Sequence, residues 1–149
     1  MRQLEQQMTV SGNSPHTLTY PEGPAQTFEV GAPVMLNASG QVIEAATGVA
    51  SVAGVAAVNA SGVTGRGCPI WVANDDTMFG VVMAGAVNAD VGKIVTIKKT
   101  GALWAADHST VGTAGGTFLI IEIGTSLPPG QTIARGKFLE SATQLSKAA

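Results

Sequence analysis

The sequence predicts an all-β protein, a small β-barrel or β-tulip-like sandwich with an extended N-terminal arm. Short runs of β-branched and aromatic residues recur along the chain, with turn signals about every 8–12 residues. No segment carries the apolar periodicity of a long amphipathic helix. At 149 residues the chain is long enough to bury a core without disulfides or a metal.

The composition excludes several classes of protein. Charged residues make up 12% of the chain, against about 25% in an average soluble domain, and the net charge is −2. The chain is therefore too poor in basic residues to bind nucleic acid by charge, and its 45% of hydrophobic residues is too high for a disordered chain. One cysteine allows no disulfide framework, and no apolar run approaches the roughly 20 residues of a membrane-spanning helix. So few charges predict a surface that other subunits cover.

The sequence divides into an extended arm at 1–26, a β-barrel or sandwich domain at 27–140 and a C-terminal tail at 141–149. Pro15, Pro21 and Pro24 disfavour helix in the arm, although Leu4 and Met8 are spaced for one short helical turn. The polar start has no apolar signal-peptide core, which predicts synthesis in a cytoplasm. We expect the arm to lie on another chain or to stay mobile.

Strands are predicted in the first half of the domain where β-branched runs stand between turn residues. Asn-Ala-Ser-Gly at 37–40 suits a hairpin, and the same letters return at 59–62. Gly54 lies inside a small-residue strand, which predicts a bulge or a close approach of two backbones. The predicted strands are 27–30, 33–37, 41–46, 50–58, 68–73 and 77–84.

The second half continues the same pattern. Residues 117–123, Thr-Phe-Leu-Ile-Ile-Glu-Ile, form the strongest β run of the chain. The other strands are predicted at 93–99, 102–107 and 132–139, and residues 140–149 are expected to form a frayed helical tail.

Candidate chemical groups are sparse. Asp-His-Ser at 107–109 is interpreted as a polar turn, because adjacent residues point in different directions whereas a catalytic triad is assembled from separate segments. Asp75 and Asp76 are interpreted as a turn and not as a calcium site, which needs ligands at several offsets. Cys68 is expected to be a small buried residue. The sequence predicts no catalytic, cofactor-binding or metal-ligating residue, and no enzyme activity.

Three segments early in the domain carry a resemblance to a known family. They are Phe-Glu-Val-Gly-Ala-Pro-Val-Met-Leu at 28–36, Gly-Gln-Val-Ile-Glu-Ala at 40–45 and Val-Ala-Gly-Val-Ala at 52–56. Together they resemble the opening of tailed-bacteriophage capsid decoration (cement) proteins. Residues 90–93 and 100–107 are similar to segments of phage structural proteins of this kind.

The resemblance implies a structural virion protein that binds the outer surface of a phage capsid. Such a protein cements neighbouring major capsid protein subunits against the pressure of packaged DNA, often as a homotrimer, and a dimer is the other possibility. It implies no catalytic residue, cofactor, nucleic acid or membrane partner. The arm of 26 residues departs from the compact pattern of the family.

Apolar residues spaced through the polar arm are the expected capsid contacts: Met8, Val10, Leu18, Tyr20 and Phe28. The alternative function is a head-surface or fibre module that recognises a host glycan on an aromatic platform. Its residues would be Tyr20, Trp71 and Trp104, although both tryptophans lie within strand patterns that favour the core.

Overall fold

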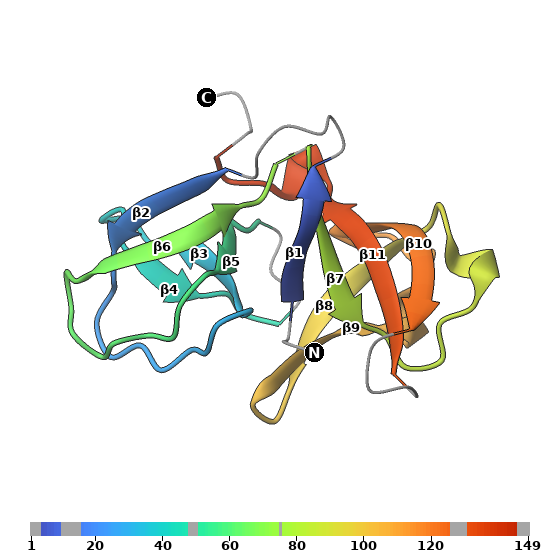
Figure 1. Ribbon diagram of the computed structural model, residues 1–149, viewed down its shortest axis with the longest axis horizontal. Helices are drawn as coiled ribbons and strands as arrows, with labels where there is room; N and C mark the ends of the chain where they lie inside the picture. Colours follow the sequence, from blue (N-terminus) through green and yellow to red (C-terminus); the bar gives the residue numbers. More distant parts are fainter. Residues whose placement is uncertain (1–3, 10–15, 48–50, 75, 126–130, 146–149) are drawn as a thin grey trace.

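The computed structural model describes residues 4–9, 16–47, 51–74, 76–125 and 131–145. In these residues the chain forms eleven strands in two antiparallel sheets, and the helical segments are three short 3-10 turns. Figure 1 shows the two sheets side by side. The predicted all-β class is confirmed, since strands and turns account for the described architecture.

The five-stranded sheet has the order β2-β6-β5-β3-β4. The 37–40 turn joins β3 to β4 as predicted, with Gly40 at a φ of +73° that glycine adopts without strain. Its strands are β2 (Thr17–Pro21), β3 (Pro33–Leu36), β4 (Val42–Glu44), β5 (Gly54–Ala56) and β6 (Gly67–Val72).

The six-stranded sheet has the order β1-β7-β11-β10-β8-β9 and curls into a half-barrel. A bulge between Ile120 and Glu122 interrupts the pairing of β10 with β11, and bulges increase the local twist of a strand. Its strands are β1 (Leu4–Thr9), β7 (Thr77–Val82), β8 (Ile94–Thr100), β9 (Leu103–Asp107), β10 (Phe118–Thr125) and β11 (Thr132–Phe138).

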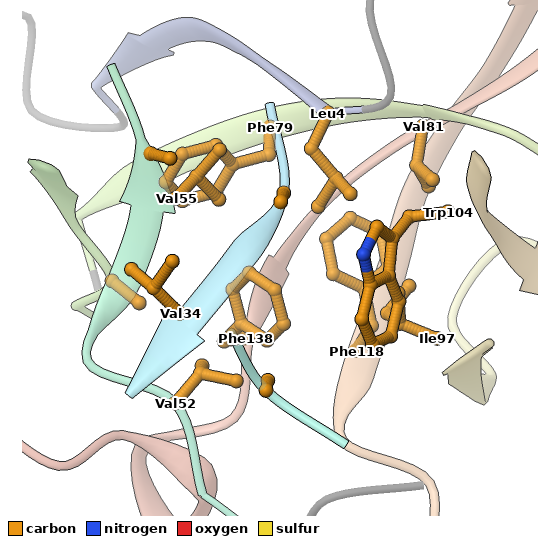
Figure 2. Packing of buried hydrophobic residues seen from close by; sticks show 14 of the residues in the cluster. Leu4, Val34, Val52, Val55, Phe79, Val81, Ile97, Trp104, Phe118 and Phe138 are labelled. Atoms are coloured by element: carbon orange, nitrogen blue, oxygen red, sulfur yellow. The ribbon is translucent and has the colours of Figure 1, made fainter. Parts of the chain in front are cut away.

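One hydrophobic core joins the two sheets. Phe138 packs edge-on against Phe79 and Phe118, at ring-centroid distances of 5.7 Å and 5.3 Å. In Figure 2 its ring lies between Val34 of the five-stranded sheet and Phe118 of the half-barrel. All of these side chains are at most 1% exposed, so the two sheets share a single dry interior.

The N-terminal segment is extended, but the expectation that it lies outside the core is wrong. Residues 4–9 form β1, which pairs with β7, and residues 17–21 form β2, which pairs with β6. Leu4 is fully buried in the shared core, and the short helical turn expected around Leu4 and Met8 does not form. Addition to a sheet satisfies the backbone of a polar segment that cannot bury much of itself.

Two further expectations are corrected. Residues 27–30 are not a strand, because Val30 N–H donates to the Asn59 side chain at 2.8 Å and not to a neighbouring strand. The helical tail is limited to Glu140–Ala142, a 3-10 turn. Gln144 then donates to Leu36 O at 3.0 Å and accepts from Leu36 N–H at 2.8 Å, which fixes the tail to β3. Residues 146–149 lie outside the described part of the chain.

Candidate functional site

The Asp-His-Ser sequence at 107–109 is a polar turn, as predicted. Asp107 Oδ1 accepts hydrogen bonds from Ser109 Oγ at 2.6 Å and from Ser109 N–H at 3.1 Å. His108 Nε2 lies 3.1 Å from Asp90 Oδ2 and belongs to a different contact. The Ser109 hydroxyl therefore binds the aspartate and not the imidazole. A nucleophilic triad would need the serine to bind the histidine and the histidine to bind the aspartate, and this arrangement is not formed.

This turn borders a cleft of about 270 Å³ between the end of β7 and the β8–β9 hairpin. Lys98 Nζ lies 4.0 Å from Asp107 Oδ2, so the charges at the rim occur as a loose pair. Small apolar and polar side chains form the remaining walls. The lining residues are Val82, Ala84, Lys98, Thr100, Ala105, Ala106, Asp107, His108 and Ser109.

Asp90 anchors the histidine at the rim of this cleft. Its side chain is 7% exposed and accepts a hydrogen bond from Val87 N–H at 2.9 Å. That bond lowers the pKa of the carboxyl most, burial opposes it, and the nearby His108 lowers it further. The imidazole also covers Gly85, where a Cβ would lie 3.3 Å from Nδ1. Asp90 thus holds His108 and the turn at residues 87–91 together.

Glu22 is a second buried carboxylate, and its residue is 2% exposed. It accepts hydrogen bonds from Ser61 N–H, Ser61 Oγ and Gly62 N–H, each at 2.8 Å. Burial by itself raises the pKa of this carboxyl, but the bonds from Ser61 and Gly62, together with the charge of Arg66, lower it below its ordinary value. Glu22 therefore fixes the second Asn-Ala-Ser-Gly turn to the end of β2.

Acid is expected to weaken this contact. The stability that ionised Glu22 adds is present above its ordinary pKa of 4.5 and is lost as the pH falls through its lowered folded-state pKa. Glu22→Gln should lower the free energy of unfolding by about 1–2 kcal/mol at neutral pH and flatten its decline below about pH 4.5. Urea unfolding across this pH range measures both effects.

Glu122→Gln is the matched control, because Glu122 is 61% exposed and faces Arg135 at 3.8 Å. It should change the free energy of unfolding at neutral pH by no more than about 0.5 kcal/mol. Asp90 and Asp107, whose pKa values are also lowered, account for the acid dependence that remains in both variants. A Glu22→Gln profile parallel to that of the wild type would show that the carboxylate contributes nothing in its charged form.

Glu44 connects the two sheets through its carboxylate. Oε1 lies 2.8 Å from Lys99 Nζ, and Oε2 accepts a hydrogen bond from Trp104 Nε1 at 3.0 Å. Lys99 N–H also donates to Thr47 Oγ1 at 3.1 Å. The β8–β9 hairpin is thereby attached to the end of β4. These partners lie 55 and 60 residues from Glu44, so the sequence offers no local signal for the contact.

The aromatic residues do not form one platform. Trp104 is 2% exposed and belongs to the core, as its strand pattern predicted. Tyr20 lies opposite Cys68 in the β2–β6 pair, whereas Trp71 lies opposite Thr17. Because successive side chains of a strand alternate between faces, Tyr20 and Trp71 lie on opposite faces of the five-stranded sheet.

The expected capsid-contact residues are distributed between interior and surface. Phe28 is 3% exposed and packs in the core, so it offers no contact surface. Tyr20 is half-buried against the core, and Leu18 is 39% exposed. Met8 pairs with Met78 through its backbone, while its side chain and all of Val10 lie outside the described part of the chain.

Apart from Leu18, the exposed bulky apolar side chains of the described residues are not those expected from the sequence, and they lie both in strands and in connecting segments. Leu103 at the start of β9 is 63% exposed. The hydrogen bond from Gly92 N–H to Ile120 O at 2.8 Å places the backbones of Val91 and Ile121 side by side. The sequence carried no signal for this exposure, because an exposed valine or isoleucine has the same strand preference as a buried one. The full set is Leu18, Val58, Val63, Val87, Val91, Leu103 and Ile121.

The remaining candidate ligands have local roles. Asn74 Oδ1 accepts from Asp76 N–H and Thr77 N–H, each at 2.9 Å, which is the predicted turn, and Asp75 lies outside the described residues. Cys68 is buried, and burial raises the pKa of its thiol to about 11. Among the described residues no three His, Cys, Asp or Glu side chains gather as a metal-binding group.

Comparison with protein-family models, with curated proteins and with solved structures finds no match for this chain. In the residues that the structure describes, no helix has the length and apolar character needed to cross a membrane.

Proposed function

We propose that this chain is a structural virion protein that binds the outer surface of a phage capsid and cements neighbouring major capsid protein subunits. In this proposal the protein is located on the virion, where it binds capsid subunits and catalyses no reaction. The observation that carries it is the placement of the exposed bulky apolar side chains, which are distributed over strands and connecting segments of both sheets and do not gather in one pocket. A protein that spans several capsid subunits needs contacts spread in this way.

Two features of the sequence support the same proposal. The segments that resemble capsid decoration proteins, at 28–36, 40–45 and 52–56, contain β3, β4 and β5, which are consecutive neighbours in the five-stranded sheet. The low fraction of charged residues, 12%, also favours a surface meant for contact with other protein. Because the contacts are many and individually weak, binding to a repeating lattice would gain from avidity.

Quantitative mass spectrometry of particles purified from the source lysate tests the proposal. The chain should be present in a near-integer ratio to the major capsid protein. A few copies per particle would assign it to a fibre or tail instead, and its absence from particles would overturn the proposal.

A variant at one of the exposed apolar residues makes the test specific to the observation that carries the proposal. Leu103→Asp should reduce the copy number on particles several-fold, because it places a charge at the most exposed of the bulky apolar side chains that the structure describes. Ala114→Asp is the matched control, since it adds the same charge to an exposed turn position without removing a bulky apolar group. Equal occupancy of the two variants would show that the exposed side chain of Leu103 does not contact the capsid.

A further inference from the structure

Strand β2 is the terminal strand in the order of the five-stranded sheet (Figure 1). Directly after it, Gly23 N–H donates to Val42 O of β4 at 2.8 Å, so within the described residues the open edge is limited to Thr17–Pro21. His16 O accepts a hydrogen bond from Val72 N–H at 2.9 Å, so even-numbered residues of this segment direct their backbone groups to β6. Thr17 and Thr19 therefore direct their N–H and C=O groups away from the sheet. No hydrogen bond from the described part of the chain engages either threonine.

This edge lacks the charged residues that commonly prevent an exposed strand from pairing with a strand of another molecule. The five residues of β2, Thr-Leu-Thr-Tyr-Pro, include no charge, whereas natural edge strands are commonly protected by lysine or other charges. Leu18 is 39% exposed although it lies opposite Ile70, a fully buried core residue. The leucine thus stands at the rim of the core, on the same face of the sheet as Ile70.

We propose that β2 pairs with β2 of a second copy of this chain, antiparallel and across a twofold axis at Leu18. In this register Thr17 of each copy faces Thr19 of the other, and each such pair exchanges two N–H···O=C hydrogen bonds. Leu18 faces Leu18 of the second copy as a non-hydrogen-bonded pair, which covers the exposed leucines and the rim of both cores. The two five-stranded sheets become one continuous sheet.

Pro21 and Leu18 together favour the register centred on Leu18. Pro21 is the next outward-facing residue of β2 and has no N–H, so a shift that sets Thr17 opposite Pro21 loses a hydrogen bond in every such pair. The register centred on Leu18 therefore keeps both of its hydrogen-bonded pairs complete, and it is the antiparallel register that places the two exposed leucines directly opposite each other. An interface made by one short strand buries little surface, so the association is weak. The fraction of dimer therefore rises with protein concentration.

This inference does not rest on the proposed function, and a disulfide trap tests its geometry. Leu18→Cys places two thiols across the axis, where the Cα atoms of a non-hydrogen-bonded pair lie about 4.5 Å apart, within the range of a disulfide. Thr17→Cys is the matched control, because its two introduced thiols would belong to diagonal neighbours about 7–8 Å apart. Wild type controls for Cys68, which is buried. Under mild oxidation Leu18→Cys should form covalent dimer several-fold faster than Thr17→Cys.

Sedimentation velocity tests the association without a crosslink. The wild type should move from monomer towards dimer as concentration rises. Thr19→Pro removes an outward N–H on each copy and none from the β2–β6 pairing, so it should remain monomeric with an unchanged melting temperature. If this variant does not fold, the comparison of the two cysteine variants decides the question.

A wild type that stays monomeric at all concentrations would overturn the proposal, as would a trimer as its first oligomer. Equal rates of disulfide formation in the two cysteine variants would overturn the register. If β2 instead binds a strand of another protein, the wild type should stay monomeric and Leu18→Cys should form no covalent dimer.

Discussion

Phe138→Ala is expected to lower the free energy of unfolding by about 3–5 kcal/mol. The ring is 1% exposed and stands edge-on to Phe79 and Phe118, so its removal leaves a cavity bounded by two other aromatic rings. Because the same ring lies between the two sheets, the cavity would weaken both at once (Figure 2). Urea unfolding followed by tryptophan fluorescence measures the loss, since Trp104 belongs to the same core.

Leu103→Ala is the control for the removal of a large apolar side chain. Leu103 is 63% exposed, and the substitution should change the free energy of unfolding by no more than about 0.5 kcal/mol. If Phe138→Ala costs as little as Leu103→Ala, the two sheets do not share the core described above. If it gives two separate unfolding transitions, the sheets fold as independent units.

The strands of the second half were predicted to within a few residues, for a local reason. β8 and β10 are rich in β-branched residues, β9 and β11 each contain an aromatic residue, and turn residues precede these strands. Local hydrogen bonds were predictable in the same way. The turn at 107–109 is closed by bonds between residues two positions apart, and such turns are encoded by Asp and Ser themselves.

The roles of β1 and β2 could not be predicted, because both strands depend on partners far along the chain. Leu4 pairs with Val81, and Thr17 pairs with Trp71. The polar composition and the prolines of the first 26 residues predict an extended segment but not the edge to which it adds. Extended conformation was therefore predictable from residue type, whereas membership of a sheet required the register of another strand.

The buried carboxylates were hidden for the same reason. Glu22 and its partner Ser61 are 39 residues apart, and no motif marks a carboxylate that receives backbone N–H groups from a distant turn. The sequence did draw attention to the turn, since the four letters at 59–62 repeat those at 37–40. The first copy closes a hairpin, while the second is held by Glu22. Identical local sequence therefore serves two tertiary roles.

Gly54 is the position at which the sequence predicted a long-range contact correctly. A glycine inside a strand of small residues indicated a bulge or a close approach of two backbones, and the structure shows the close approach, because a Cβ at position 54 would overlap the carbonyl oxygen of Trp71. Gly54 pairs with Val72 of β6 and with Val34 of β3, so it joins the middle of the five-stranded sheet. The absence of a side chain permits both neighbours to approach.

Gly54→Ala is therefore expected to lower the free energy of unfolding by about 3 kcal/mol or more, because the overlap is with backbone that cannot rotate away. Thermal and urea unfolding of the purified variant measure the loss. A lower yield of folded protein is also expected, since the methyl group separates β5 from β6 and thereby the β3–β4 hairpin from the rest of its sheet.

Gly40→Ala provides the comparison, because it makes the same chemical change without the overlap. No atom lies within 4 Å of a Cβ at this position, and the cost arises only from the φ of +73°, at about 1 kcal/mol. The difference between the two variants isolates the steric term from the conformational one. If Gly54→Ala costs no more than Gly40→Ala, β5 can move away from β6 without loss, and the five-stranded sheet is held by its edges and not by its centre.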